Sequence, residues 1–508
     1  MAIQVIDIFA GPGGLGEGFS SFSPTYGDER SFFRIAVSAE MEPNAARTLR
    51  LRAFFRMFPS GHAPASYYDY VAGRRAEPWT DATLAEWRAS GEEALQLELG
   101  RSEDDDRLYA RISRVINSDR PWVLIGGPPC QAYSLVGRAR NKGIAGYRAD
   151  TDSRHELYKH YLHIIQRHAP AAFVMENVKG ILSSRVNGEL MFPRILEDLS
   201  RPGGKQGPRY DIVPLLVPDD SRHNSQSPKD FVLRAEDMGV PQARHRVVLL
   251  GVAEGIARDR ATFLKPIAQR FSVNDVIKGM PRRRSGVTDA TVDLWSSTAA
   301  NILEVASRAA GPGRPIVAKA LAKLATKAER CRSDPGPGGR WTPRTAHSDN
   351  VPLHLRSWLL DPRLDGIPNH EVREHMTSDL VRYAYASMFA QTHGHSPRGS
   401  ADFPMALHPL HKNWESGKFV DRFKVQIGDQ PSSTVTSHLS RDGHYFIHPD
   451  PSQFRSLSVR EAARLQTFPD NYFFEGSRGA QFRQVGNAVP PWLARQIAAT
   501  VYSILAGA

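Results

Sequence analysis

The stretch VLIGGPPCQAYS, residues 123–134, decides how this chain is interpreted. The apolar run that begins at Trp122 predicts a buried strand, because it contains Val and Ile and ends abruptly at two glycines. The two prolines fix φ and remove two backbone donors, so Cys130 stands on a stiff loop at the carboxyl end of that strand. Ligands bind at this edge of open α/β sheets. We therefore predict that Cys130 is a presented nucleophile rather than a buried, space-filling thiol.

A second loop of interest lies near the N-terminus, in VIDIFAGPGGLGEGF, residues 5–19. A strand that runs into a glycine-rich turn and then a helix receives nucleotide-type cofactors in doubly wound folds. The glycines do not follow the strict dinucleotide pattern, so the loop alone is weak evidence. The next predicted strand, residues 34–39, ends in Glu40, about 20 residues after the loop, where a carboxylate can accept from ribose hydroxyls.

Strand and helix patterns alternate through residue 251. A helix from about His155 to Arg167 precedes a strand over 172–175 that ends in Glu-Asn, and further strands are expected over 210–217 and 247–251. The alternation predicts an α/β fold with a parallel Rossmann-like sheet that has helices on both faces. The polar, mostly helical stretch over about 71–120 is interpreted as a surface insertion in the domain formed by residues 1–251.

The composition describes an ordinary globular protein: 508 residues, 41% hydrophobic and 23% charged, enough for two or three domains. The sequence contains no run of about 18 apolar residues that would predict a membrane span, and no leader pattern that would predict export. We therefore expect a cytoplasmic protein. Two cysteines far apart in the sequence argue against a disulfide framework and against a cysteine-based zinc site. We expect no metal.

The net charge of +11 favours a polyanionic partner, and the excess is local. Residues 256–350 contain 17 Lys/Arg and 8 Asp/Glu, and the cluster Arg282, Arg283 and Arg284 is predicted to contact phosphates. We interpret residues 252–453 as a separate basic unit. Residues 454–508 return to a helical pattern, which includes a capping box from Ser458 to Glu461.

Three sets of side chains are expected to converge at one sheet edge: Cys130, Glu176, and the pair Arg244 and Arg246. A thiolate there could add to an electron-poor ring carbon, a carboxyl group whose pKa is raised by burial could hold a ring nitrogen, and an arginine could hold a ring oxygen. Together they would activate a pyrimidine ring for electrophilic attack at C5.

In this order the motifs resemble those of the DNA (cytosine-5) methyltransferase family. The matching segments are DIFAGPGG (7–14), GPPCQ (127–131), ENV (176–178), Gln-x-Arg-x-Arg (242–246), the segment 457–469, and GNAVPP (486–491). The resemblance covers roughly residues 1–251 and 455–508.

The resemblance implies S-adenosyl-L-methionine as methyl donor, S-adenosyl-L-homocysteine as product, and a flipped-out cytosine as substrate. Cys130 would attack C6, Glu176 would bind N3 and the exocyclic amine, and Arg246 would hold O2 with support from Arg244. The implied cofactor residues are Phe9, Gly11, Gly14, Leu15, Glu40, Asp69, Pro129, Leu157, Asn487 and Ala488. Gln131, Ser134 and Thr434 would contact DNA, Thr434 within a short motif over 431–436.

By the same resemblance, residues 252–453 form the target-recognition domain of an enzyme that acts on double-stranded DNA. We expect a monomer near the bacterial nucleoid, with a restriction nuclease or another phage-defence protein as a possible functional partner. The main alternatives are a tRNA cytosine-5 methyltransferase of the same family and a catalytically silent DNA-binding protein. A Rossmann oxidoreductase would leave Pro-Pro-Cys-Gln and Gln-x-Arg-x-Arg unexplained.

Overall fold

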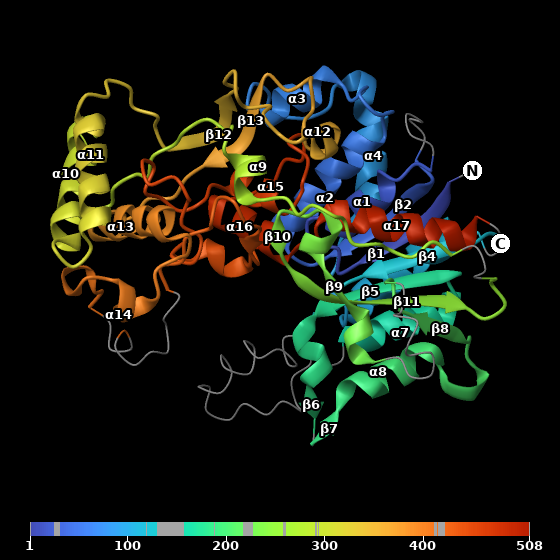
Figure 1. Cartoon of the computed structure of the whole chain (residues 1–508). Coiled ribbons are helices and arrows are strands. Elements are labelled where there is room, and N and C mark those ends of the chain that lie inside the picture. Colours follow the sequence, from blue (N-terminus) through green and yellow to red (C-terminus); the bar gives the residue numbers. More distant parts are fainter. Residues whose placement is uncertain are drawn as a thin grey trace.

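The computed structural model (Figure 1) describes residues 2–24, 31–117, 119–129, 157–186, 188–216, 227–257, 261–289, 292, 294–410, 414 and 422–506. A central sheet lies at one end of the molecule, and a group of helices lies at the other end. Within the described ranges, no helix has both the length and the apolar character needed to cross a membrane.

The sheet has eight strands, seven of them in the order β3-β2-β1-β4-β5-β11-β8, while β9 pairs with β11. Their bounds are β1 Ile3–Ile8, β2 Phe33–Glu40, β3 Ala94–Gln96, β4 Trp122–Gly126, β5 Ala172–Val178, β8 Tyr210–Val213, β9 Val232–Arg234 and β11 His245–Ala253. This confirms the α/β fold class. The strands from β3 to β5 are parallel, so their carboxyl ends form one edge.

The prediction of an entirely parallel sheet is wrong for β11, which runs antiparallel to β5, β8 and β9. In this register Val248 lies opposite Glu176 and Arg246 lies opposite Val178. The physical reason is the short connection from β9 to β11, since antiparallel strands can be joined without a crossover helix. The reversal brings the start of β11 to the edge where β5 ends.

The interpretation of residues 71–120 as a surface insertion is also wrong. β3 extends the central sheet next to β2, and α5 (Ser102–Val115) buries Leu108 and Ile112 in the same core as Leu124. Only the first turn of α5 carries the acidic run, where carboxylates complement the helix dipole. A three-residue strand is too short for its alternation to be recognised in the sequence.

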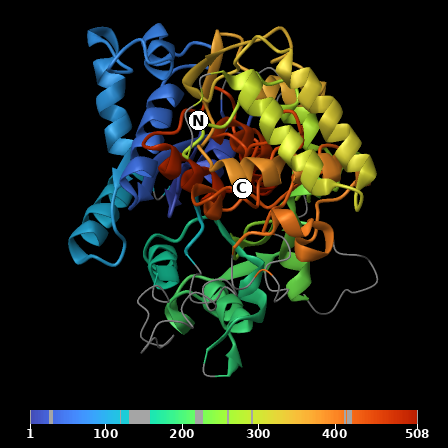
Figure 2. The same cartoon turned by 90° about the vertical axis from the view of Figure 1, so that its left-hand side faces the viewer.

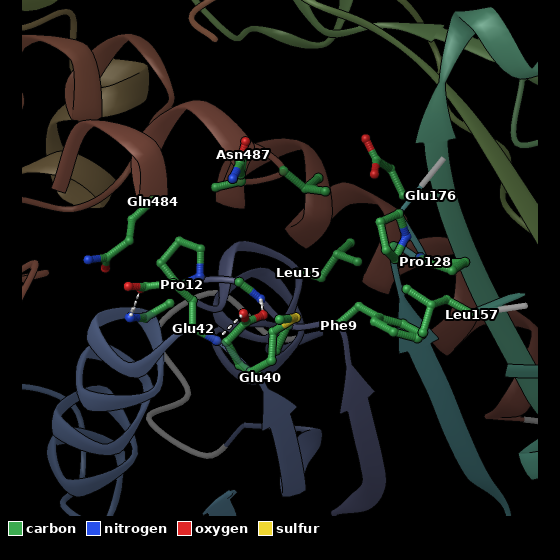
Figure 3. A pocket seen from close by; sticks show the side chains of 18 of the residues that line it. Phe9, Pro12, Leu15, Glu40, Glu42, Pro128, Leu157, Glu176, Gln484 and Asn487 are labelled. Atoms are coloured by element: carbon green, nitrogen blue, oxygen red, sulfur yellow. Dashed lines mark hydrogen bonds between the residues drawn. The ribbon is translucent and has the colours of Figure 1, made fainter. Parts of the chain in front are cut away.

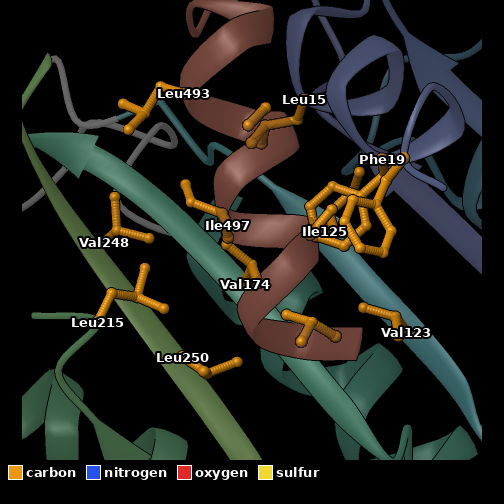
Figure 4. Packing of buried hydrophobic residues seen from close by; sticks show 14 of the residues in the cluster. Leu15, Phe19, Val123, Ile125, Val174, Leu215, Val248, Leu250, Leu493 and Ile497 are labelled. Carbon is orange, nitrogen blue, oxygen red and sulfur yellow. The ribbon is translucent and has the colours of Figure 1, made fainter. Parts of the chain in front are cut away.

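Helices cover both faces of the sheet. α1 (Gly14–Ser20) and α17 (Pro491–Leu505) lie on one face, where Ile497 packs toward β5 and β11 (Figure 4). The full burial of the Ile497 side chain stabilises the folded state by about 1.5–3 kcal/mol. The other face holds α5, α7 (Leu157–His168) and α8 (Met191–Ser200). The remaining elements of this half are α2 Pro43–Arg56, α3 Ala65–Val71, α4 Leu84–Glu93, and the β6–β7 hairpin, Arg185–Val186 and Glu189–Leu190.

The rest of the chain packs in two further buried clusters, one of which continues into the C-terminal segment. The elements are α9 Val273–Ile277, α10 Trp295–Ala310, α11 Pro315–Glu329, β12 Gly338–Pro343, α12 Leu353–Leu359, β13 Gly366–Glu371, α13 Thr377–His393, α14 Gly399–Asp402, β14 Ser432–Ser433, α15 Val459–Leu465 and α16 Arg478–Asn487. Val276, Leu355, Val435, Leu465 and Phe482 belong to a single buried cluster. The boundary expected at residue 453 therefore falls inside a continuous core.

Buried arginines join the two sides of that expected boundary. Arg464 makes a bidentate ion pair with Asp470 and also donates to the carbonyls of Val276 and Ser348. Arg455 is fully buried against Glu461. Glu461 also completes the predicted capping box with Ser458, which the structure confirms.

Candidate active site

A pocket of about 1170 Å³ opens at the carboxyl ends of β1, β2, β4 and β5. Its wall also includes the segment 97–101 after β3, the start of α7, and residues 483–489 of α16 and the turn that follows. Figure 3 shows Glu40 at one end and Glu176 at the other, with Phe9 and Leu15 between them. Parallel strands thus bring residues from distant parts of the sequence to one cavity.

The glycine-rich turn after β1 shapes the floor of this pocket. Phe9, Gly11 and Gly13 all have left-handed φ angles, of 54°, 56° and 94°. A side chain at Gly13 would clash with Leu49 and Tyr472, and a Cβ on Gly14 would lie 2.1 Å from the carbonyl oxygen of Val489. The turn therefore needs glycine for its conformation and also for contact with the C-terminal segment.

Glu40 is fixed by two backbone donors. One of its carboxylate oxygens accepts from the amide of Gly11 and the other from the amide of Glu42, each at 2.8 Å (Figure 3). Burial raises the pKa of Glu40, while these two hydrogen bonds act in the opposite direction. Each oxygen keeps a further lone pair, so the carboxylate can accept from ligand hydroxyls in the pocket.

Most residues expected to bind a cofactor line this pocket: Phe9, Gly11, Leu15, Glu40, Pro129, Leu157, Asn487 and Ala488. Gly14 lies directly beneath and contacts Val489. The prediction for Asp69 is wrong, because it lies on α3, outside the pocket wall, and its half-exposed carboxylate pairs with Arg74 at 2.9 Å. Leu97 to Arg101 line the pocket instead, and they were missed in the sequence because β3 was missed.

Glu176 and Arg246 form an ion pair at the other end of the pocket. Arg246 Nε lies 2.8 Å from Glu176 Oε1, and the two side chains are only 12% and 13% exposed. A Cβ on Gly127 would lie 3.1 Å from Glu176 Oε2, so glycine leaves room for this carboxylate. The pair offers an acceptor and guanidinium donors side by side, which suits the edge of a polar ring.

The neighbouring Asn177 ties β5 to the loop after β4. Its amide donates to the carbonyl of Pro128 at 3.1 Å, and its side-chain oxygen accepts from the amide of Val178. Pro129 is the last residue described before the loop, and Cys130, Gln131 and Ser134 lie outside the described residues. Pro129, the residue before Cys130, thus lines the same pocket as the Glu176–Arg246 pair.

Arg244 belongs to the wall of the same pocket, and it also joins three segments of the chain. It is buried and donates to the carbonyls of Val435 (2.8 Å) and Gly486 (3.2 Å). Burial, together with the charge of Arg246, lowers the pKa of Arg244. Its expected support of Arg246 remains a prediction.

The short motif over 431–436 lies against the same strand. β10 (Gln242–Ala243) pairs with β14, Gln242 accepts from the amide of Val435 at 2.9 Å, and the Thr434 hydroxyl donates to the carbonyl of Ala243 at 2.6 Å. The hydroxyl of Thr434 thus already donates within the protein. Its predicted contact with DNA remains a prediction.

The three consecutive arginines also have partners within the protein. Arg284 makes a bidentate ion pair with Asp334 and lies over the ring of Trp295, and Arg283 donates to the carbonyl of Pro335. Arg282 donates to Ser452 but keeps a side chain that is 59% exposed. The fold thus brings residues 334–335 against Arg283 and Arg284. The predicted phosphate contacts of the three arginines remain a prediction.

Among the described residues, no group of three or more His, Cys, Asp or Glu side chains is arranged to hold a metal ion.

Comparison with known proteins agrees with this geometry. Residues 104–300 and 362–503 match the family model of C-5 cytosine-specific DNA methylases. The chain belongs to this family. It is a DNA (cytosine-5) methyltransferase, and the pocket that contains Glu40, Glu176 and Arg246 is the candidate active site of this methylase.

Several known proteins align with nearly the whole length of the methylase chain. It is 30% identical to the Type II methyltransferase M.Bpa9945I of Bacillus paralicheniformis, with 99% of each chain covered. It is 26% identical to the Type II methyltransferase M.AgeI of Thalassovita gelatinovora, over 98% of this chain and 99% of that one. An Escherichia coli crystal structure, described as a prophage-encoded DNA modification methyltransferase, shares the fold with a TM-score of 0.52, 20% identity, and 99% and 100% coverage.

Proposed function

We propose that this methylase transfers a methyl group to C5 of a cytosine flipped out of duplex DNA, through a covalent bond between Cys130 and C6. The observation that carries the proposal is the buried Glu176–Arg246 pair beside Pro128 and Pro129, immediately before Cys130 in the chain. This pair lies in the same cavity as Glu40, so a base and a cofactor could meet inside one pocket.

The ion pair would read the cytosine edge. Glu176 Oε1 is held by Arg246 Nε, which leaves Glu176 Oε2 as an acceptor for the exocyclic amine. Protonated, the same carboxyl group would donate to N3, and Arg246 would donate to O2. Since Arg246 also donates to the carbonyl of its neighbour His245, its guanidinium is oriented before a base arrives.

The other end of the pocket fits S-adenosyl-L-methionine. Glu40 would accept from the ribose hydroxyls, Phe9 and Leu157 would form apolar walls, and a Cβ at Gly11 would meet nothing within 4 Å, so this loop leaves open space for a ligand. When bound, the cofactor supplies an electrophilic methyl group. The pocket volume of about 1170 Å³ is sufficient for a nucleoside-sized ligand together with a base.

The chemical steps follow from these groups. The Cys130 thiolate forms a bond with C6, and the C5–C6 π electrons move toward C5, which becomes nucleophilic. Glu176 stabilises the ring by holding N3. After C5 gains the methyl group, the C5 proton leaves to a base, the double bond re-forms, and the bond from sulfur to C6 breaks.

The biological setting we propose is restriction-modification or phage defence in a bacterial cytoplasm. The relatives named above are called Type II methyltransferases, a term used for enzymes that accompany restriction nucleases. We propose double-stranded DNA as substrate, read by a monomer, with a cognate nuclease as functional partner.

Bisulfite sequencing of plasmid DNA from cells that express the protein tests the proposal. We expect methylated cytosines in one sequence context, and none in a matched culture that expresses Cys130→Ala. Methylation by the Cys130→Ala variant would contradict the covalent mechanism. Unmethylated plasmid DNA together with methylated tRNA from the same cells would instead establish the tRNA alternative.

A further inference from the structure

The hairpin formed by α10 and α11 is not explained by the proposed chemistry. It lies at the far end of the molecule from the sheet, with α13 between it and α16, and it comes to the front when the molecule is turned (Figures 1 and 2). α11 lies wholly outside the two stretches that match the family model, 104–300 and 362–503. Its role therefore has to be derived from its own residues.

One face of α11 is fixed in the core. Val317, Leu321 and Ala325 are buried against α10 and α13 at four-residue spacing. Lys319, Lys323 and Lys327 each follow a core residue by two positions, which corresponds to about 200° around the helix axis. The three lysines therefore project away from the core, and all three are exposed.

These lysines have no partners within the described residues: none makes an ion pair or a hydrogen bond there. Like charges at four-residue spacing destabilise a helix, so the arrangement opposes local stability. An acidic residue at any of these positions would relieve the repulsion. This repulsion between neighbouring lysines is not compensated by a partner within the described residues, which indicates a functional surface.

The positive charge extends beyond α11. Residues 295–332 contain seven Lys/Arg and two Glu, and Arg330 and Arg332 directly after the helix are exposed. The exposed Arg282 precedes Arg283 and Arg284, which bond to Pro335 and Asp334 just beyond the end of α11. We call the exposed basic residues from Lys319 to Arg332, together with Arg282, the basic stripe; the exposed Glu329 lies within it, and Arg282 lies 3.7 Å from Asp450.

We propose that this stripe, centred on Lys319, Lys323 and Lys327, binds backbone phosphates of duplex DNA that flanks the target site. The inference rests on the proposed function, which supplies duplex DNA as the partner. Lysines contact phosphates as point charges without sequence preference. α11 lies at the far end of the molecule from the sheet whose strand ends form the pocket. The stripe would extend the footprint of the enzyme rather than set its specificity.

DNA length separates this contact from binding at the pocket. A chain of 508 residues is roughly 60 Å across, whereas a duplex of about 12 base pairs spans roughly 40 Å and one of about 36 base pairs roughly 120 Å. We would compare the wild type with the triple variant Lys319→Gln, Lys323→Gln and Lys327→Gln on both duplexes, centred on the mapped target. The matched control replaces the same three lysines by arginine, which keeps the charge.

We expect the glutamine variant to weaken binding of the long duplex several-fold and to lower the slope of log K against log salt by about 2–3, or about 0.9 for each lost contact. The arginine variant should retain the wild-type slope. Binding of the short duplex and the methylation rate at saturating DNA should not change. An unchanged slope on the long duplex, or an equal loss on the short one, would overturn the inference.

Cys331 provides a second, direct readout. In a Cys130→Ala background it is the remaining thiol of the chain, and it is exposed beside Lys327 and Arg330. We expect the long duplex, and not the short one, to slow alkylation of Cys331 several-fold. Equal alkylation with and without the long duplex would contradict the inference. If the wild type methylates plasmid cytosines but neither readout responds, the proposed function stands and only this inference fails.

Discussion

At the scale of single residues, the site depends on a few side chains whose freedom is removed by backbone contacts. Glu40 is held by two amides, and Glu176 is held by Arg246, which in turn donates to the carbonyl of His245. Such fixed groups need little reorganisation when a ligand binds. The chemistry therefore depends on the geometry that the folded protein sets in advance.

The first prediction at this scale concerns Glu176→Gln. The amide has nearly the shape of the carboxyl group, but it cannot transfer a proton to N3 and it lacks the charge that pairs with Arg246. We expect kcat to fall by about 10²–10³-fold, the range for loss of one group that stabilises developing charge. Single-turnover methylation assays would measure it, with circular dichroism as a control for folding. Activity within threefold of the wild type would contradict the proposed role.

A second prediction concerns Gly14→Ala. The new Cβ would lie 2.1 Å from the carbonyl of Val489 and would push residues 488–490 away from the floor of the pocket. Because Ala488 and Asn487 line the pocket, we expect weaker cofactor binding by about tenfold or more, measured by isothermal titration with S-adenosyl-L-homocysteine. Gly11→Ala is the contrasting variant, since its Cβ meets nothing within 4 Å but its φ is positive. The φ of Gly14 is not left-handed, so an unchanged affinity of Gly14→Ala would contradict the role of the Val489 contact.

At the scale of elements, α15 joins the two parts of the molecule. It begins at the capping box of Ser458 and Glu461, and all seven of its residues are buried. Arg464 on this helix pairs with Asp470 and also reaches the carbonyl of Val276 on α9. A short helix thus connects the C-terminal segment with the region expected to recognise DNA.

The prediction at this scale is that Asp470→Asn destabilises the protein far more than a typical surface change. It would leave the fully buried Arg464 without its counter-charge, and breaking such a pair costs about 3–5 kcal/mol. Urea denaturation would measure the loss. The matched control is Asp334→Asn, which removes the more exposed carboxylate of the Arg284 pair and should cost about 1 kcal/mol or less. Similar losses in the two variants would contradict the role of α15 as a buried connection.

At the scale of the whole molecule, buried histidines make the fold sensitive to acid. Burial lowers the pKa of His370 and of His448 to about 4, although Glu461 lies near both rings. Burial lowers the pKa of His375 to about 3. All three lie in the half of the chain beyond β11, so protonation of any of them opposes folding of the same region.

The sign of the pH effect follows from these values. Unfolded histidine has a pKa of about 6.5, so the unfolded state binds more protons between about pH 4 and pH 6.5, and stability falls as the pH falls through that window. We expect the urea midpoint to decrease from about pH 7.5 to about pH 5, and His448→Phe to reduce the decrease. A decrease in the variant equal to that of the wild type would assign the acid sensitivity to other groups.

The sequence by itself determined the fold class, the glycine-rich loop after β1, and the segments that meet at the pocket, because glycine turns, strand ends and motif order are local properties. Only the tertiary structure decided which side chains remain free. Asp69, Arg283 and Arg284 have the residue types expected of ligand contacts, yet their partners Arg74, Pro335 and Asp334 occupy them. The strand β3 could not be predicted, because three residues are too few to show an alternation of apolar and polar side chains. The antiparallel direction of β11 could not be predicted either, because it depends on the length of the connection between strands. Ion pairs across long sequence separations form only after the chain has folded, so no local pattern could have predicted them.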